Sequence, residues 1–246
     1  ALDFRMAIIN FVLRGAEERA ELTSQLQRSN KELESFSYSV SHDLRAPFRH
    51  IVGYTQLLRE REQSLSDQSR HYLDSINEAA ASAGQLVDDL LSFSQLGRTT
   101  LAVSPVDMHK LVQEIIRSVE PDIGGRQIEW RVQPLPPTKG DAGLLRQAIY
   151  NLVDNALKYT RDRTPTIVEI DGEQTRTECI YTVRDNGVGF DMAYVHKLFG
   201  VFQRLHSATD FEATGVRLAK VRPIVQPHGG RTWAESVLNE GATFYF

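Results

Sequence analysis

The sequence predicts an α-helical hairpin over residues 1–98, followed by a separate α/β domain over residues 104–246. In the first part, apolar residues recur at helical spacing and proline occurs once, at Pro47. In the second part, segments in which apolar and polar residues alternate, as in strands, are interspersed with segments of helical periodicity. The other eight of the nine prolines also occur here. The change in composition near residues 97–105 predicts a domain boundary there.

The composition excludes several classes of protein. The 246 residues carry a formal net charge of −4, so no positive field favours nucleic acid or anionic lipid as a partner. The single Cys179 cannot form an intramolecular disulfide, which favours a reducing compartment such as the cytoplasm. The apolar run within residues 7–13 is far shorter than the roughly 20 residues of a spanning helix, so we expect no membrane segment.

The first part is expected to be two antiparallel helices. The first enters from upstream, and its apolar stripe comprises Leu22, Leu26, Leu33, Phe36 and Val40. Helical periodicity is lost over residues 61–69, and Ser66 is the expected N-cap of the second helix. The stripe of that helix comprises Tyr72, Leu73, Ile76, Ala80, Ala83, Leu86, Val87, Leu90, Leu91 and Phe93. Two helices cannot enclose a core, so we expect a homodimer in which two hairpins form a four-helix bundle.

The second part is expected to alternate helices with strands. The predicted helices cover residues 106–119, 142–159 and 215–228. The predicted strands cover residues 127–132, 166–171, 179–184, 231–237 and 242–246.

The first motif of candidate catalytic residues is His42-Asp43, one turn before Pro47 in the first helix. An imidazole is a nucleophile when one ring nitrogen is free and a carboxylate holds the proton on the other. Pro47 removes a helical hydrogen bond to the carbonyl of Asp43 and is expected to bend the helix. Taken alone, such a pair is more often an ordinary surface histidine beside an acidic residue.

The second motif is a set of polar residues within the helix expected at 142–159. Asn151, Asn155 and Lys158 are spaced i, i+4, i+7, so they share one face, opposite Leu152 and Val153. Amide oxygens are hard ligands suited to Mg²⁺, and a lysine adds a point charge for phosphate. The alternative is a solvated helix face.

The third motif is Asp185-Asn186-Gly187-Val188-Gly189, which follows a predicted strand. Two glycines at a strand end allow a flat ligand to approach the main chain. Asp185 can accept a hydrogen bond from an exocyclic amine. The alternative is a glycine-rich turn.

The fourth motif is the long segment from Phe199 to Gly215, which lacks periodicity and leads into a predicted helix. Segments of this length inside a compact domain are typically lids or disordered. Arg204 and His206 can reach a phosphate, and the following helix N-terminus presents free N–H groups to an anion.

In this order, the four motifs resemble the transmitter region of a two-component sensor histidine kinase over nearly the whole chain. VSHDLRAP resembles the H box, NLVDNALKY the N box, DNGVGFD the G1 box, LFGVFQRLH the F box, and ATGVRLA the G2 box. The segments SFSYSVSHDLRAP and FQRLHSA are similar to the corresponding segments of kinases attached to phytochrome-type photoreceptors.

The resemblance implies a dimerisation and phosphotransfer hairpin followed by an ATP-binding α/β sandwich of the gyrase, Hsp90 and histidine kinase type. His42 would be the phosphoacceptor and Asp43 its general base or orienting group. Asn155, with help from Asn151, would hold Mg²⁺. The implied nucleotide contacts are Lys158, Tyr159, Asp185, Gly187, Gly189, Arg204, His206 and Gly215. The phosphoryl group would pass from ATP to His42, then to an aspartate of a response regulator, under control of an upstream sensor domain.

The chain departs from the family pattern at two places. The G2 box typically reads G-x-G-x-G, and the aligned residues are Ala213, Gly215 and Arg217. Arg217 therefore either blocks the triphosphate or contacts it, and blockage is our prediction. Pro223 is expected to kink or fray the last helix at Arg222. Ala46 stands where phosphatase-active relatives carry Thr or Asn, which argues against phosphatase activity.

Two functions from different classes follow from these residues. One is an active ATP-dependent histidine kinase, and the other is a dimeric transmitter scaffold that turns over ATP poorly or not at all. An ATPase of the gyrase or Hsp90 type is disfavoured, because nothing in such an enzyme needs the helix that carries His42.

Overall fold

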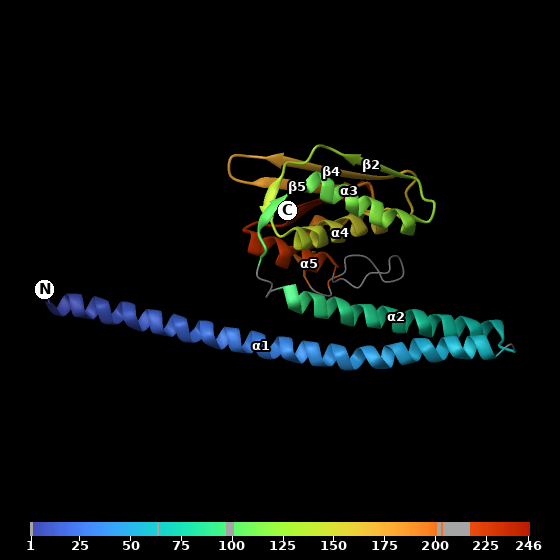
Figure 1. Cartoon of the computed structure of the whole chain (residues 1–246), viewed down its shortest axis with the longest axis horizontal. Coiled ribbons are helices and arrows are strands. Elements are labelled where there is room, and N and C mark those ends of the chain that lie inside the picture. Colours follow the sequence, from blue (N-terminus) through green and yellow to red (C-terminus); the bar gives the residue numbers. More distant parts are fainter. Residues whose placement is uncertain (1, 63, 97–100, 201–202, 204–216) are drawn as a thin grey trace. The chain divides into compact units, whose positions relative to one another are not determined.

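The computed structural model describes residues 2–62, 64–96, 101–200, 203 and 217–246. The chain divides into two compact units, Ala1–Ser94 and Gln95–Phe246. The first unit contains two long helices, and the second is an α/β domain (Figure 1). No helix within the described residues is long and apolar enough to cross a membrane.

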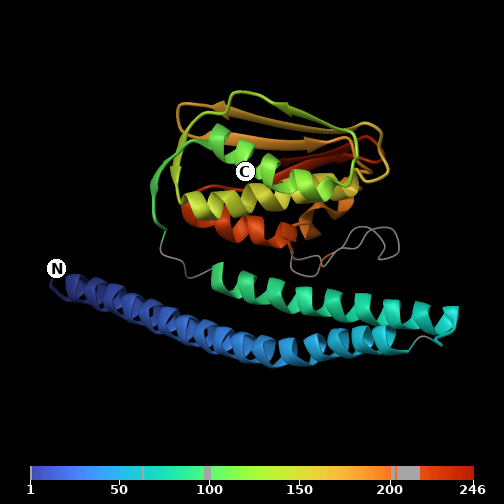
Figure 2. The same ribbon diagram turned by 45° about the vertical axis from the view of Figure 1, so that its right-hand side comes forward.

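The first unit is an antiparallel helical hairpin, as predicted. α1 spans Leu2–Arg61 and α2 spans Asp67–Leu96. Ser66 caps α2, because its hydroxyl accepts a hydrogen bond from the N–H of Ser69 at 3.1 Å. α1 continues unbroken through Pro47, and Figure 2 shows it as a curved rod.

Ion pairs join the two helices along their length. A guanidinium nitrogen of Arg59 lies 2.7 Å from a carboxylate oxygen of Asp74. Nearer the other end of the hairpin, the Nε atom of Arg45 donates to Asp88 at 2.9 Å. These contacts set the register of α1 against α2.

The hairpin leaves a row of large apolar side chains in solvent. Four of those on α1 follow steps of seven, three and four residues, which is the spacing of one helix face: Leu44, Ile51, Tyr54 and Leu58 are all exposed. On α2 the exposed side chains are those of Tyr72 and Ile76. We call these six residues the apolar stripe. Apolar residues at this spacing on an exposed face are typical of a helix-packing surface.

The second unit is built on a five-stranded sheet with the order β2-β4-β5-β7-β6. Its strands are β2 (Ile128–Val132), β4 (Thr166–Gln174), β5 (Cys179–Asp185), β6 (Trp233–Val237) and β7 (Gly241–Tyr245). β2 pairs with β4 in parallel, and the other neighbours are antiparallel. A separate antiparallel pair consists of β1 (Ser104–Val106) and β3 (Thr138–Gly140).

Three α-helices lie on one side of this sheet (Figures 1 and 2). They are α3 (Met108–Val119), α4 (Ala142–Tyr159) and α5 (Arg217–Val225). The 3₁₀ helices are η1 (Glu120–Ile123), η2 (Met192–Lys197) and η3 (Gln226–His228). Strand side chains alternate, so that Val168, Ile170 and Val183 are buried and join the apolar side chains of α3 and α4 in one core. The second unit is therefore a two-layer α/β sandwich.

Sequence and structure differ at a few elements of the second unit. The short strands β1 and β3 were not expected, and β1 takes Val106 from the predicted start of α3. α5 continues through Pro223 to Val225 instead of fraying at Arg222. The proline removes only the bond to the carbonyl of Ala219, and the buried side chains of Val221, Ile224 and Val225 hold the last turn against the core.

Candidate functional site

His42 lies on the solvent-exposed side of α1. Its side chain is 71% exposed, that of Asp43 is 80% exposed, and their Nδ1 and Oδ1 atoms are 3.2 Å apart. With the proton on Nδ1 directed to this carboxylate, the lone pair of Nε2 points away from Asp43. The arrangement suits a nucleophile that an external group approaches from solvent.

The turn of α1 that carries His42 is anchored on both sides of the imidazole. Ser41 is buried, and Arg45, three residues after His42, forms an ion pair with Asp88 on α2. The exposed imidazole therefore projects from a helical turn whose position is set by α2.

α4 carries the second predicted set of residues, and its start is fixed by Asp141. One carboxylate oxygen of this N-cap accepts hydrogen bonds from the N–H groups of Gly143 at 3.0 Å and Leu144 at 3.1 Å. These bonds, together with one from Ala102, hold the pKa of Asp141 below its ordinary value. The N–H of Asp141 donates to Nε2 of His228, which ties this end of α4 to η3.

The polar face of α4 is not an ordinary solvated face. Asn151 is only 5% exposed, and its amide nitrogen has no hydrogen-bond partner in the described protein. Asn155 and Lys158 are half-buried on the same face, whereas Leu152 and Val153 are buried in the core. A buried amide group without an internal partner is typical of a site that receives a ligand or water.

Asp185 ends β5 as a buried carboxyl group. Its Oδ1 atom accepts a hydrogen bond from the N–H of Gly187 at 2.8 Å. Burial raises the pKa of Asp185 to about 6, although the N–H groups of Gly187 and Ala242 act in the opposite direction. A buried carboxyl group with a raised pKa, next to a glycine loop, is a candidate for ligand recognition.

The loop after Asp185 packs against the end of α4. The N–H of Val188 donates to the carbonyl oxygen of Tyr159 at 3.2 Å. A Cβ atom on Gly187 would lie 2.5 Å from that same oxygen, so only glycine fits here. Gly189 has a φ of +61°, and a Cβ atom there would lie 2.1 Å from the carbonyl oxygen of Val237. The structure thus brings Tyr159, Asp185, Gly187 and Gly189 together.

The remaining predicted residues are divided between described and undescribed parts of the chain. Arg204, His206, Ala213 and Gly215 lie outside the described residues. Arg217 is the first residue of α5, and its guanidinium forms an ion pair with Asp154 on α4, one residue before Asn155.

Sequence reasoning missed three residues that support this region. Arg163 donates from Nη2 to the carbonyl oxygens of Gly187 at 3.2 Å and Asn239 at 2.6 Å. Arg126 contacts the end of α4 from the loop before β2. Loop arginines have no periodic signal that would have identified either one. Gly241, whose Cβ atom would lie 1.9 Å from the carbonyl oxygen of Asp185, was detectable as a turn glycine before a strand.

Two family descriptions match the chain. Residues 32–99 match the "His Kinase A (phospho-acceptor) domain". Residues 140–246 match the "Histidine kinase-, DNA gyrase B-, and HSP90-like ATPase" family. The first match contains His42 and Asp43, and the second contains the polar face of α4 and the loop after Asp185.

Curated proteins also match this chain over its whole length, across both of these domains. Cyanobacterial phytochrome A of Nostoc sp. is 36% identical over 100% of this chain and 32% of the relative. Phytochrome-like protein Cph1 of Synechocystis sp. is 33% identical over 100% of this chain and 33% of the relative. The chain thus spans about a third of the length of these relatives.

A solved structure shares the fold of most of the chain. The crystal structure of full-length ShkA in complex with AMPPNP is 27% identical, with a TM-score of 0.64, and the match covers 85% of this chain and 44% of that one.

Proposed function

We propose, from the premise that the chain belongs to the sensor histidine kinase family, that it phosphorylates His42 with ATP and passes the phosphoryl group to an aspartate of a response regulator. The observation that carries this proposal is the exposed imidazole of His42 with its Nδ1 atom 3.2 Å from Asp43, inside the part of the chain that matches a phospho-acceptor domain. An exposed, carboxylate-paired imidazole is what transfer from a separate nucleotide-binding domain requires.

The second unit offers residues that fit a nucleotide. The unpartnered amide of Asn151 and the buried carboxyl of Asp185 are polar groups that the protein interior leaves for a ligand. We assign Asn155, with Asn151, to Mg²⁺. We assign Lys158 and Tyr159 to the triphosphate and adenine, and Asp185 to the adenine amine. Gly187 and Gly189 shape the floor of that site.

Residues outside the described part complete the assignment. We assign the phosphate contacts that the F and G2 boxes imply to Arg204, His206 and Gly215. The crystallised relative ShkA was obtained in complex with AMPPNP, which supports an adenine nucleotide as the ligand of this domain.

The proposed chemistry of the hairpin is in-line phosphoryl transfer. ATP supplies the phosphoryl group when it is bound. Nε2 of His42 attacks the γ-phosphorus, a P–N bond forms, and the bond to the bridging oxygen breaks. Asp43 holds the proton on Nδ1 and stabilises the positive charge that develops on the ring. Attack by the aspartate of the regulator then breaks the P–N bond and regenerates His42.

The apolar stripe supports a second copy of this chain as the hairpin's partner. Two hairpins facing each other would bury both stripes in a four-helix bundle, which is the homodimer that the sequence predicts. The response regulator is the second proposed partner. An upstream sensor domain is proposed from the length of the phytochrome relatives, and the cytoplasm is the proposed compartment.

Incorporation of labelled γ-phosphate tests the proposal. We expect wild-type protein to incorporate label, His42→Ala to incorporate none, and His50→Ala to resemble wild type. His50 is the matched control, because it is also an exposed histidine on α1. Equal labelling of wild type and His42→Ala would reject His42 as the acceptor.

A transmitter scaffold with weak turnover is the second candidate, and the Arg217–Asp154 ion pair favours it. This contact holds the guanidinium of Arg217, from α5, against α4 next to Asn155, where we assign Mg²⁺ and the triphosphate. Nucleotide binding without phosphorylation of His42 would support the scaffold over the kinase.

A further inference from the structure

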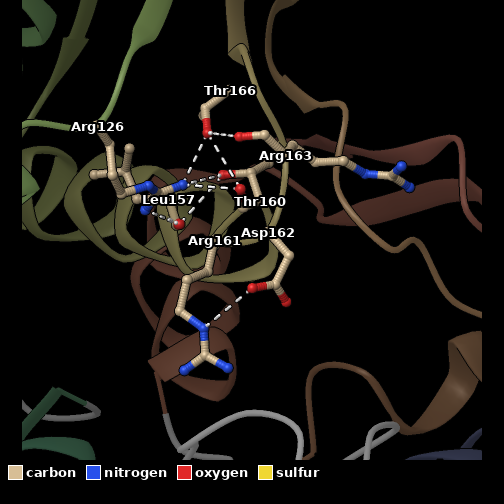
Figure 3. A network of polar contacts seen from close by, with 7 residues as sticks. All are labelled: Arg126, Leu157, Thr160, Arg161, Asp162, Arg163 and Thr166. Atoms are coloured by element: carbon tan, nitrogen blue, oxygen red, sulfur yellow. Dashed lines mark hydrogen bonds and ion pairs between the residues drawn. The ribbon is translucent and has the colours of Figure 1, made fainter.

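Arg126 makes four hydrogen bonds to buried or half-buried groups of the second unit (Figure 3). Its Nη1 atom donates to the carbonyl oxygen of Leu157 at 2.8 Å. Its Nη2 atom donates to the carbonyl oxygen of Thr160 at 2.9 Å, to the hydroxyl of Thr160 at 3.2 Å and to the hydroxyl of Thr166 at 2.8 Å. Thr160 and Thr166 are fully buried. The guanidinium therefore lies at the end of α4 and at the start of β4 simultaneously.

The position suits a cation at the carboxyl end of a helix. The last carbonyl groups of a helix lack intrahelical donors, and a positive charge there interacts favourably with the helix dipole. Burial lowers the pKa of Arg126, because desolvation disfavours its charge. Its four acceptors are neutral oxygens, so the bonds have a geometric role and do not neutralise the charge.

The groups that Arg126 holds are next to the proposed nucleotide site. Leu157 and Thr160 flank Lys158 and Tyr159, and the carbonyl oxygen of Tyr159 accepts the hydrogen bond from Val188 in the loop after Asp185. A shift of this turn would therefore move the loop as well as α4.

The start of β4 contacts the same loop. The N–H of Ile167, which follows Thr166, donates to the side chain of Asn186 at 2.8 Å, and the N–H of Asn186 donates back to the carbonyl oxygen of Ile167 at 3.3 Å. Arg126 thus joins the two elements on which the loop after Asp185 rests.

We propose that Arg126 is a positioning residue for nucleotide binding. It fixes the last turn of α4 relative to β4, so that Lys158 and Tyr159 keep their spacing from Asp185. This inference rests on the proposed nucleotide site, and it adds a residue that has no contact with the nucleotide itself. Lysine is not equivalent, because one ammonium nitrogen cannot reproduce the planar fork, in which Nη1 donates to Leu157 while Nη2 donates to Thr160 and Thr166.

The test compares the affinity of full-chain variants for ADP by calorimetry, under conditions in which circular dichroism shows each variant to be folded. We expect Arg126→Ala and Arg126→Lys to weaken ADP binding by about ten- to a hundredfold, the range that misplaced binding groups produce. Arg131→Ala is the matched control, because Arg131 is an exposed arginine on β2 whose partners, Glu129 and Glu169, lie away from α4. It should bind ADP as wild type does.

Rescue separates positioning from a merely structural role. Millimolar guanidinium, far below the molar concentrations that unfold proteins, should restore ADP affinity to Arg126→Ala and leave Arg131→Ala unchanged. If Arg126→Ala does not fold, Arg126→Lys and Thr166→Val carry the test, with weakened affinity again expected.

Each outcome has a definite meaning. Wild-type affinity in a folded Arg126 variant would overturn the inference and leave the proposed function intact. Weakened affinity that guanidinium does not restore in Arg126→Ala would also overturn it. A wild-type protein that binds neither ADP nor ATP would overturn both this inference and the proposed function.

Discussion

The guanidinium of Arg217 is paired with the carboxylate of Asp154, one residue before Asn155 on α4. Both side chains are partly exposed, and surface ion pairs of this kind contribute at most about 1 kcal/mol, or about fivefold in an equilibrium constant. The pair can therefore weaken nucleotide binding but cannot abolish it by itself. A loss of this size fits the candidate with weak turnover, and complete loss of activity would need a further cause.

We predict that Arg217→Ala tightens nucleotide binding by up to about fivefold, because it removes a group held beside the proposed Mg²⁺ site. Titration with a fluorescent ADP analogue measures the change. Arg222→Ala is the control, since Arg222 is also an exposed arginine on α5. Weaker binding by Arg217→Ala would show instead that the guanidinium contacts phosphate.

Asp185→Asn is predicted to stabilise the protein near pH 8. Burial raises the pKa of Asp185 to about 6, whereas an unfolded aspartate titrates near 4, so folding favours the neutral form. The wild-type protein therefore loses roughly 3 kcal/mol of stability as the pH rises from 4 to above 6. Asparagine is neutral throughout and still accepts the hydrogen bond from Gly187.

Denaturant titrations at pH 4 and pH 8 measure this effect. The variant should be more stable than wild type at pH 8, and the difference should shrink towards pH 4. The same variant should bind nucleotide more weakly, because an amide lacks the charge that strengthens a hydrogen bond from the adenine amine. Equal stability of the two proteins at pH 8 would contradict the raised pKa.

Gly187→Ala is predicted to damage the loop after Asp185. The added Cβ atom would lie 2.5 Å from the carbonyl oxygen of Tyr159 and 2.7 Å from Oδ1 of Asp185, and overpacking of this kind costs about 1–3 kcal/mol. Thermal unfolding and ADP titration should both show a loss. Gly143→Ala is the control, since its Cβ atom would approach only the Asp141 side chain, at 3.3 Å. A Gly187→Ala variant with unchanged ADP affinity would argue against a role of this loop in binding.

The apolar stripe is predicted to form the dimer interface. Ile51→Asp combined with Leu58→Asp places charge on two exposed residues of the stripe, so it should convert a dimer to a monomer. Light scattering coupled to size exclusion measures the mass. Gln56→Asp is the control, because it adds a charge to an exposed position of α1 outside the stripe. A double variant that remains dimeric would place the interface elsewhere.

The elements that sequence predicted well are those with strong local signals. α4 begins and ends at the predicted residues, 142 and 159, and the structure shows that Asp141 supplies its N-cap. Ser66 was likewise identifiable from its position before the periodic segment. The strands β1 and β3 could not be predicted, because each has three residues and they form only by pairing with each other across a large separation in sequence.

The features of the candidate site also differ in how well the sequence predicts them. The chemistry assigned to His42, Asn155 and Asp185 rests on their residue types and their order in the chain, and it stays a prediction. The burial of Asn151 depends on tertiary packing, which spacing along one helix cannot reveal. The bonds of Arg126 depend on the approach of α4 to β4, so a loop arginine becomes recognisable only in three dimensions.

The most direct test of the central claim is to locate the phosphate after incubation of the wild-type protein with ATP and Mg²⁺. Tandem mass spectrometry under neutral or alkaline conditions, which preserve phosphohistidine, identifies the modified residue. The account predicts a phosphate on the imidazole of His42 that is lost on brief exposure to acid. Phosphate on another residue, or none on His42 in protein that binds ATP, would contradict it.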